Sequence, residues 1–481
     1  MHGITLTEAP GDWEVLQQKE GKARVTLKGT FQVHPAAMDV GVERVTPIVR
    51  VMREDDNMTV VPWTAADRYR CDEDLPNESR KGSFETTLEI PAGGPYRIDT
   101  SLETKSTTPD LVWLHRGDCV LHIGVGSLFI IAGQSNSAGY SRDFCMDPPS
   151  MDVHLFRNRG RWDIASHPMN ESTAAGSLPN EEMGVSGVSP YLSFGKRYAQ
   201  LTGMPVGLIQ TSLGGSPMSR WMPPDGDLYR NMLDRIHRTG GSYAGVLWYQ
   251  GCSDTSPGAA EHYLENFREY TEAVRRELGY EIPFFTMQLN RQINGLYDEC
   301  WGMVREAQRR AAKEIPKVYL ITTSNLALCD GIHNTAPANV ALGEKLAMQC
   351  CEVLNGGEEY QPPEVCMVDW AAPEVRKEFQ LEGTGIWLRL TCGHVKNCFI
   401  VYSALGQDSG FTLTDERGEV EILHIRGNRN NKNILYLELA RRPEGKAELS
   451  FAWQANPVRY PPVDEATYMP LVSFYRRKLE L

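Results

Sequence analysis

The chain has 481 residues, of which 41% are hydrophobic and 23% are charged, as in folded globular proteins. This composition excludes an intrinsically disordered chain, and at roughly 150 residues per domain the length indicates two to four domains. The 49 Lys and Arg residues and the 62 Asp and Glu residues give a formal net charge of −13. We expect no nucleic-acid partner for such a chain, because phosphate contacts need clustered Lys and Arg.

No apolar run approaches the roughly 18 residues of a membrane-spanning helix, and no signal peptide is visible at the N-terminus. We therefore expect no membrane partner and a cytoplasmic location. The 11 cysteines include no C-x-x-C pair, which favours free thiols over a disulfide framework or a zinc cluster. No histidine or cysteine spacing is typical of a metal site, so neither a metal nor a cofactor is predicted. The oligomeric state stays open.

The first part of the chain, residues 1–120, predicts an all-β accessory domain. Short alternating runs lie at residues 23–27, 45–51 and 84–90, and turn residues such as PAGGP at 91–95 separate them. An alternation of apolar and polar residues is typical of half-buried strands.

The middle part, residues 121–358, predicts an α/β domain. Short apolar runs are typical of strands that are buried on both faces of a parallel sheet. They lie at residues 128–132, 206–210, 245–249, 283–289 and 318–322. Helical stretches alternate with them, at residues 259–278, 300–314 and 337–354 among others. This order predicts a parallel sheet flanked by helices.

The last part, residues 359–481, returns to the alternating pattern. Runs of this kind lie at residues 385–390, 398–402, 434–439 and 447–453. They predict a second β-rich region, which is a candidate for packing against the first one.

Polar side chains follow the predicted strands of the middle domain, where ligands of open parallel sheets bind. The first strand runs into GQSNSAG at residues 133–139, which places Ser135 at a tight turn where a helix begins. A hydroxyl there lies beside backbone N–H groups that can stabilise an oxyanion. Ser is also a common helix cap, so Ser135 alone leaves both interpretations open.

Residues that follow three further predicted strands complete the set of chemical groups that acyl transfer needs. Gly214 and Gly215 follow the second strand, Gln250 follows the third, and Asp330-Gly331-Ile332-His333 follows the fifth. Paired glycines bring main-chain N–H groups close to a ligand, an amide can donate to an oxyanion, and an Asp orients a His that acts as general base. Each motif alone is also compatible with ordinary loop structure. Together they supply a nucleophile, oxyanion donors, a base and its orienting acid.

These segments resemble the SGNH (GDSL-like) hydrolases, and within them the sialate O-acetylesterase-like carbohydrate esterases. The resemblance lies in GQSNSAG (133–139), QTSLGGSPMSRW (210–221), WYQGCSD (248–254) and DGIH (330–333), and residues 167–168 and 187–190 also resemble family segments. It covers about residues 121–355. It implies an α/β fold with an SGNH-type, flavodoxin-like parallel sheet, to which the terminal all-β regions are added.

The resemblance also implies roles for single residues. Ser135 corresponds to the nucleophile, His333 to the general base and Asp330 to the acid that orients it. The oxyanion hole would consist of the N–H groups of Ser135 and Gly215 and the side chain of Gln250. Gly215 is preferred over Gly214, because the hole-forming glycine of related motifs directly precedes a polar turn residue.

Two residues are predicted to contact substrate, Trp221 as an apolar face for a sugar ring and Gln134 beside the nucleophile. The family usually has Met where this chain has Ser137 and Glu where it has Cys252. The second difference removes a carboxylate close to Gln250, and its effect stays open.

We therefore expect a serine esterase, a carboxylic ester hydrolase that removes O-acetyl groups from acetylated sugars through an acetyl-enzyme. Sialic acid and plant-derived xylo- or manno-oligosaccharides are the candidate substrates, and the acetylated hydroxyl stays open. Two alternatives remain: a lipase-like or thioesterase-like acyl hydrolase, and a non-catalytic carbohydrate-binding protein. Cys252 is disfavoured as a nucleophile, because no His is adjacent to it in sequence.

Overall fold

The computed structural model describes the whole chain except residues 1, 36, 38–40, 73–79, 107–111, 172–180, 183–185, 358–359, 374–376, 378–382, 458–459 and 481. It forms two compact units. The first consists of Met1–Phe129, Pro148–Ser166 and Tyr198–Ile209, and the second of Ile130–Asp147, His167–Arg197 and Gln210–Leu481. None of the described helices is long and apolar enough to cross a membrane.

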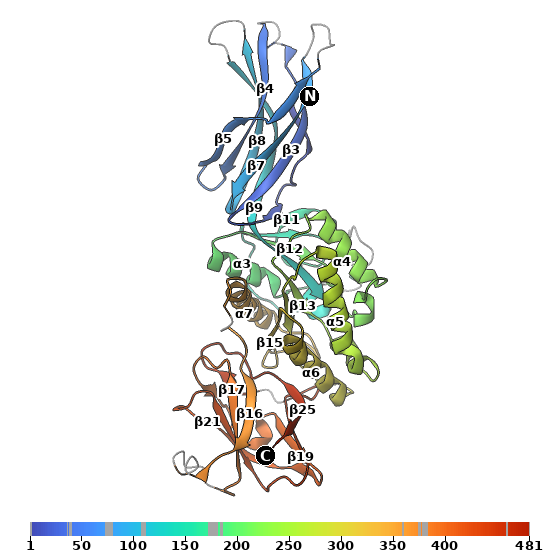
Figure 1. Cartoon of the computed structure of the whole chain (residues 1–481), viewed down its shortest axis with the longest axis vertical. Helices are drawn as coiled ribbons and strands as arrows, with labels where there is room; N and C mark the ends of the chain where they lie inside the picture. The colour runs from blue at the N-terminus through green and yellow to red at the C-terminus, as the bar shows by residue number, and fades with distance from the viewer. Residues whose placement is uncertain are drawn as a thin grey trace. The chain divides into compact units, whose positions relative to one another are not determined.

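A sandwich of two sheets makes up most of the first unit (Figure 1). One sheet has the antiparallel order β1-β3-β7-β6, and the other contains β5, β4, β8 and β9 as successive antiparallel neighbours. The bounds are β1 (Gly3–Glu8), β2 (Val15–Gln17), β3 (Lys22–Gln32), β4 (Val42–Arg53), β5 (Thr59–Ala65), β6 (Arg68–Cys71), β7 (Lys81–Pro91), β8 (Gly93–Ser106) and β9 (Val112–Gly133).

The core of the sandwich is formed by side chains from both sheets. Leu27 and Leu88 come from one sheet, and Val49 and Ile98 from the other. Buried and exposed residues alternate strictly along β7, as expected for a strand with one face in the core. The predicted N-terminal β region is therefore present, but the predicted boundary after residue 120 lies inside β9, which continues to Gly133.

The larger sheet continues along the path β11-β10-β12-β9-β13-β14-β15. These strands are β10 (Val153–Phe156), β11 (Trp162–Ile164), β12 (Val206–Gln210), β13 (Gly245–Tyr249), β14 (Phe284–Met287) and β15 (Val318–Ile321). The pairs β10–β12, β13–β14 and β14–β15 are parallel, whereas β11 is antiparallel to β10 and β8 to β9. The sheet is thus mixed, which corrects the prediction of a parallel sheet, because β9 also pairs with antiparallel β8 and β10 with antiparallel β11.

Helices alternate with these strands, as the sequence predicts. Their bounds are α2 (Ser135–Ala138), α3 (Tyr191–Thr202), α4 (Asp227–Arg238), α5 (Ala259–Leu278), α6 (Asp298–Glu314) and α7 (Ala336–Leu354), with short 3₁₀ turns η2 (Met218–Trp221), η3 (Cys252–Asp254) and η4 (Gly406–Asp408). Aromatic packing of Tyr270 against Trp248 and Phe284 holds α5 on β13 and β14. Thr335 caps α7 by accepting the N–H of Ala338 at 3.3 Å.

The C-terminal strands form a β region of their own in the second unit (Figure 1). Two four-stranded sheets, β16-β17-β22-β21 and β20-β19-β23-β25, share one apolar core, and β18 pairs with β24. The bounds are β16 (Glu364–Trp370), β17 (Trp387–Gly393), β18 (Phe399–Ile400), β19 (Phe411–Asp415), β20 (Gly418–Val420), β21 (Ile422–Gly427), β22 (Ile434–Leu439), β23 (Ala447–Phe451), β24 (Val463–Asp464) and β25 (Phe474–Leu479).

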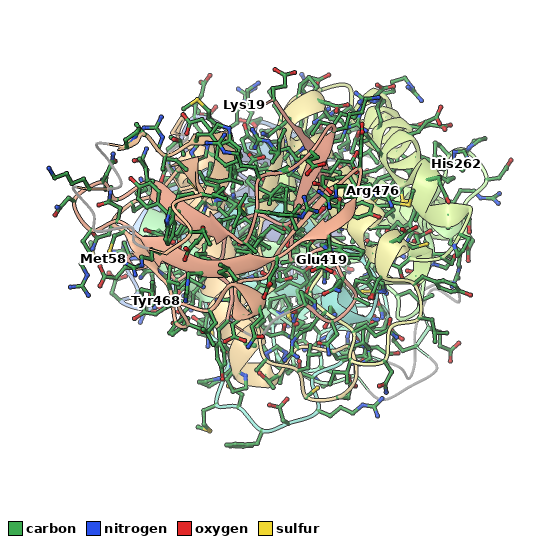
Figure 2. All side chains as sticks on the ribbon, turned by 90° about the horizontal axis from the view of Figure 1, so that it is seen from below. Lys19, Met58, His262, Glu419, Tyr468 and Arg476 are labelled. Atoms are coloured by element: carbon green, nitrogen blue, oxygen red, sulfur yellow. The ribbon has the colours of Figure 1, made fainter. Side chains whose placement is uncertain are left out.

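One contact of this region uses the backbone of Tyr468, whose side chain lies exposed at the surface (Figure 2). Its carbonyl oxygen accepts hydrogen bonds from Lys345 Nζ at 2.8 Å and Asn325 Nδ2 at 3.1 Å. Burial lowers the pKa of Lys345 to about 8. The loop after β24 is therefore tied to α7 and to the segment that follows β15.

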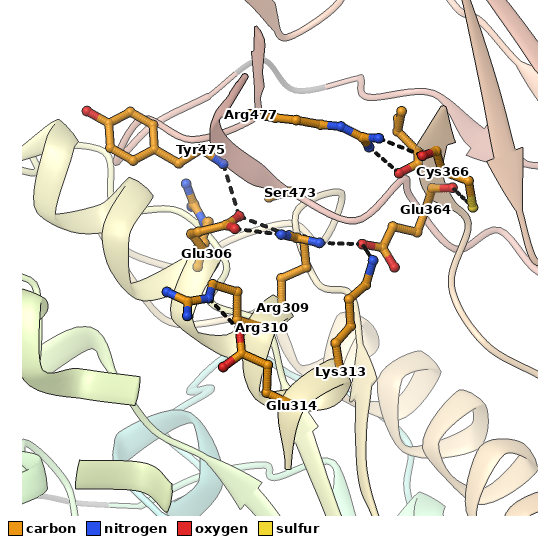
Figure 3. Close-up of polar contacts among 12 residues, drawn as sticks. Glu306, Arg309, Arg310, Lys313, Glu314, Glu364, Cys366, Ser473, Tyr475 and Arg477 are labelled. Atoms are coloured by element: carbon orange, nitrogen blue, oxygen red, sulfur yellow. Dashed lines mark hydrogen bonds and ion pairs between the residues drawn. The ribbon is translucent and has the colours of Figure 1, made fainter. Parts of the chain in front are cut away.

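A network of ion pairs joins α6 to the C-terminal strands (Figure 3). Arg309 donates to both oxygens of Glu306, at 2.6 and 2.9 Å, and to Glu364 at 2.7 Å. Glu306 also accepts the N–H of Tyr475, and Lys313 pairs with Glu364 at 2.6 Å. The side chains of Arg309, Glu306 and Glu364 are only 16–20% exposed. The network is therefore largely desolvated.

We expect Arg309→Ala to lower the free energy of unfolding by about 2–4 kcal/mol, because it leaves two poorly solvated carboxylates without their shared cation. Arg310→Ala is the matched control, since Arg310 is half exposed and pairs with Glu314 within one helix. That pair should contribute at most about 0.5 kcal/mol. Equal destabilisation of the two variants in urea titrations would contradict the bridging role of Arg309.

Candidate active site

The predicted nucleophile lies at a turn that only glycine permits. Gly133, the last residue of β9, has a φ of 128°, and a Cβ atom there would lie 2.3 Å from the carbonyl oxygen of Tyr249. The turn lets α2 begin at once, with Ser135 as its first residue. Ser135 is 7% exposed, and its backbone N–H has no acceptor among the residues that the structure describes. A hydroxyl and an unused N–H therefore lie together.

Asp330 and His333 form the predicted pair. The Nδ1 atom of His333 lies 2.7 Å from Asp330 Oδ2, and Oδ1 of the same carboxylate accepts the N–H groups of Ile332 and His333 at 2.8 and 2.7 Å. Burial raises the pKa of Asp330, but these hydrogen bonds outweigh it and hold the pKa below its usual value. The ionised carboxylate fixes the Nδ1–H tautomer, which leaves Nε2 as the ring nitrogen that can accept a proton.

Asn136 joins the two halves of this site. Its Oδ1 accepts the N–H of Asn334 at 3.0 Å, and its Nδ2 donates to the carbonyl oxygen of Ile332 at 3.4 Å. Asn136 directly follows Ser135, and Asn334 directly follows His333. These bonds therefore bring together the segments that carry the predicted nucleophile and the predicted base.

The loop after β12 distinguishes between the two candidate glycines. The N–H of Gly214 donates to Glu182 Oε1 at 2.8 Å and is thus engaged. Gly215 has a φ of 65° and is exposed, and its N–H has no acceptor within the described part of the chain. Of the two N–H groups, that of Gly215 is thus the one left able to donate to an oxyanion, and its role in the oxyanion hole stays a prediction.

Glu182 is a positioning residue that the sequence analysis missed. Its carboxylate is buried and accepts hydrogen bonds from Gly214, from Asn170 Nδ2 at 2.6 Å and from the Tyr140 hydroxyl at 2.6 Å. The ring of Tyr140 lies 5.1 Å from that of His333, centroid to centroid. Burial and the bond to Glu182 raise the pKa of Tyr140. One carboxylate therefore links the glycine loop to the residue that packs on His333.

The side chain of Gln250 is placed differently from the prediction. It is fully buried, and its amide nitrogen donates to the carbonyl oxygen of Ser216 at 3.1 Å and to Asp254 Oδ2 at 2.5 Å. Both N–H groups are thus engaged, and neither is left to donate to an oxyanion. This arrangement makes Gln250 a brace between β13 and the loop that follows Gly215.

Two predicted substrate contacts also lie in the core. Trp221 is 0% exposed, its Nε1 donates to Ser216 Oγ, and its ring packs edge-on against Trp248. Gln134 is 4% exposed, and its Oε1 accepts the N–H groups of Gly251 and Ser253 at 2.9 and 3.2 Å. Neither side chain is placed to touch a sugar. Both position the loops around Ser135, because a buried polar group is held by internal hydrogen bonds.

The residues of this candidate site lie within a segment that is similar to known proteins. Residues 125–352 match the family model described as carbohydrate esterase, sialic acid-specific acetylesterase. The chain is also 28% identical over 244 residues to a probable carbohydrate esterase from Arabidopsis thaliana. This match covers 46% of this chain and 88% of that protein. Residues 125–352 are therefore similar to carbohydrate-esterase domains.

A solved structure extends the likeness in fold to the flanking regions. A carbohydrate acetylesterase from Xanthomonas citri matches with a TM-score of 0.62 and 18% identity, over 99% of each chain. The structure titled NanS matches with a TM-score of 0.40 and 12% identity, over 48% of this chain and 97% of the other. At 18% identity the Xanthomonas match supports the fold, including the β regions at both ends.

Cys252 lies within the matched residues 125–352, beside a buried cation. Burial raises the pKa of its thiol to about 12, and the charge of Arg305 opposes that shift. Arg305 is 0% exposed and donates to the carbonyl oxygens of Leu289, Asn290, Ala452 and Gln454. Burial lowers its pKa to about 10. The thiol is therefore protonated at neutral pH, which argues against Cys252 as a nucleophile.

We expect Gln250→Ala to lower the free energy of unfolding by about 2–3 kcal/mol, because the Asp254 carboxylate and the Ser216 carbonyl lose a buried donor. Turnover per folded molecule should fall less than the factor of about 10²–10³ that follows loss of an oxyanion donor. Gln349→Ala, which removes another buried amide, bound to Leu320, is the control. A large loss of kcat with an unchanged thermal midpoint would restore Gln250 to the oxyanion hole.

Proposed function

We propose that the chain is a serine O-acetylesterase that acts on acetylated sugars through an acetyl-enzyme, with sialic acid or xylo- and manno-oligosaccharides as candidate substrates. The observation that carries the proposal is the pairing of Asp330 with His333, on a loop that Asn136 ties to the segment of Ser135. The Arabidopsis relative is described as a probable carbohydrate esterase, and the Xanthomonas neighbour as a carbohydrate acetylesterase.

The reaction proceeds in two steps. His333 Nε2 takes the proton of the Ser135 hydroxyl as its oxygen attacks the acetyl carbonyl, and Asp330 stabilises the imidazolium that forms. The N–H groups of Ser135 and Gly215 bind the tetrahedral oxyanion. The sugar hydroxyl then leaves with the proton from His333. Water attacks the acetyl-enzyme with His333 again as base, which releases acetate and restores Ser135.

Acetate release from a panel of acetylated sialic acids, xylo-oligosaccharides and manno-oligosaccharides tests this proposal. One class of sugar should give the highest kcat/KM, and p-nitrophenyl acetate should also be turned over. Mass spectrometry of acid-quenched enzyme should show an added acetyl group on the peptide that contains Ser135. Absence of turnover on every acetyl ester would reject the esterase and favour a carbohydrate-binding role.

A further inference from the structure

A polar depression lies on the β sandwich of the first unit. It has a volume of about 280 Å³, close to the lower end of ligand pockets, and suits a single sugar residue better than a long chain. Its lining comes from β4, β5, β8 and β9, the four neighbouring strands of one sheet. All of these residues belong to the first unit.

The lining side chains lie on the outer face of this sheet. Val49 and Val51 of β4 are buried in the sandwich core, so Arg50 between them points to the opposite face. Arg50 is the cross-strand partner of Asp99 on β8, and Asp99 is in turn the partner of Cys119 on β9. The depression therefore crosses three adjacent strands in one row.

Charge on this face is strongly positive for an acidic protein. Asp99 holds Arg50 by one oxygen at 2.8 Å and Arg97 by the other at 2.9 Å, each through the guanidinium Nε. Arg116 adds a third guanidinium, whose side chain has no hydrogen bond or ion pair within the described part of the chain. Three cations face one carboxylate, in a chain with a net charge of −13.

An aromatic ring lies beside these cations. Trp63 of β5 is 38% exposed, and the guanidinium of Arg50 lies 4.6 Å from the centre of its ring. Leu114, at 59% exposure, adds a second apolar surface to the lining. An exposed indole offers a flat apolar surface, and a free guanidinium offers two parallel donors that match a carboxylate.

We propose that this face binds an acidic sugar residue, a uronic or a sialic acid, with its carboxylate on Arg116 and its ring against Trp63. The excess of two positive charges selects an anion, and the aromatic side chain selects an anion that carries an apolar face. Arg50 and Arg97 are held in place by Asp99 before the ligand arrives, which reduces the entropy lost on binding. The site is separate from Ser135 and His333 and does not depend on their catalytic role.

Binding of sugars without ester groups to the full-length chain tests the proposal. N-Acetylneuraminic acid and glucuronic acid are titrated by calorimetry beside N-acetylmannosamine and glucose, their neutral counterparts, and sodium sulfate. The two acids should bind saturably and the neutral sugars at least about tenfold more weakly. Equal binding of neutral sugars would overturn the role of the arginines, and equal binding of sulfate would reduce the site to a general anion patch.

Two variants locate the binding on this face. Trp63→Ala and Arg116→Gln should each raise the dissociation constant of the acids about ten- to hundredfold. Arg24→Gln is the matched control, because Arg24 lies exposed on β3 of the other sheet. Turnover of p-nitrophenyl acetate should be unchanged in all three variants. Acid binding that is unaffected by both Trp63→Ala and Arg116→Gln would overturn the site even if the esterase proposal holds.

Cys119 gives a readout that needs no variant. It is a free, exposed cysteine that lines the depression, whereas Cys366 is exposed on β16 of the second unit. Bound acidic sugar should slow alkylation of Cys119 by iodoacetamide, measured by peptide mass spectrometry, and leave Cys366 unaffected. Equal rates for Cys119 with and without saturating ligand would contradict binding at this face.

Discussion

Ser135→Ala should lower kcat for acetyl esters by a factor of about 10⁴ or more while the protein stays folded. The reason is that a nucleophile and its base act as a unit, so that removal of either one removes nearly all of their joint effect. His333→Ala should therefore cost about as much. The double variant should lose little more than either single variant, and this non-additivity is the sharper part of the prediction.

Ser137→Ala is the matched control, two positions further along α2. Ser137 is buried and bonds the carbonyl oxygen of Ala132 at 3.0 Å and the hydroxyl of Tyr191 at 2.8 Å. Its loss should lower the thermal midpoint and leave kcat per folded molecule within about tenfold of wild type, since it makes no bond to reacting atoms. Near-complete activity of pure Ser135→Ala, or additive losses in the double variant, would remove Ser135 from the nucleophile position.

The sequence was sufficient to locate the strand ends that hold the proposed site residues. Short apolar runs located β12 and β13 to the residue, because both strands are buried on both faces and glycine or polar loops bound them. The pairing of Asp330 with His333 follows from a spacing of three, which one turn of chain can close. Gly215 was preferred to Gly214, and the bond from Gly214 to Glu182 now gives a physical reason for that choice.

Other features depend on contacts between distant segments, which no local pattern contains. Strand β10 has only four residues, and its formation depends on pairing with β12. Glu182 reaches Gly214 and Tyr140 from a separate loop. The same dependence on distant contacts explains why the sequence did not reveal that Trp221 and Gln134 lie in the core. A polar or aromatic residue in a family motif can support the site from the core, and only burial distinguishes support from contact with the ligand.

The sequence contains one clue that the segments of Ser135 and His333 meet. Asn136 and Asn334 directly follow the predicted nucleophile and the predicted base, and each is almost completely buried. Buried amides are rare unless they are hydrogen-bonded. Asn136 Oδ1 accepts the backbone N–H of Asn334, whereas the Asn334 side chain donates to Asn339 and accepts from Asn290. An asparagine next to each candidate catalytic residue is thus a reason to expect that the two segments meet.

The second large effect is expected for Asp330→Asn, which should lower kcat by a factor of about 10⁴ without loss of the fold. An asparagine can still accept the N–H groups of Ile332 and His333 through its carbonyl oxygen. Its NH₂ group would then face Nδ1 of His333, where it can only donate. The imidazole is driven to the opposite tautomer, with its proton on Nε2, and cannot accept the proton of Ser135.

The pH dependence of stability tests whether the Asp330 carboxylate is ionised and hydrogen-bonded in the folded protein. Hydrogen bonds hold the pKa of Asp330 below its usual value despite burial, so the folded state binds this proton less readily than the unfolded state. The stabilisation is therefore complete above the unfolded value of about 3.9 and is lost as the pH falls through the folded value. The difference in thermal midpoint between wild type and Asp330→Asn should be constant from about pH 6 to 8 and shrink below about pH 4. A midpoint difference that grows on acidification would contradict the stabilising role of the ionised Asp330 carboxylate.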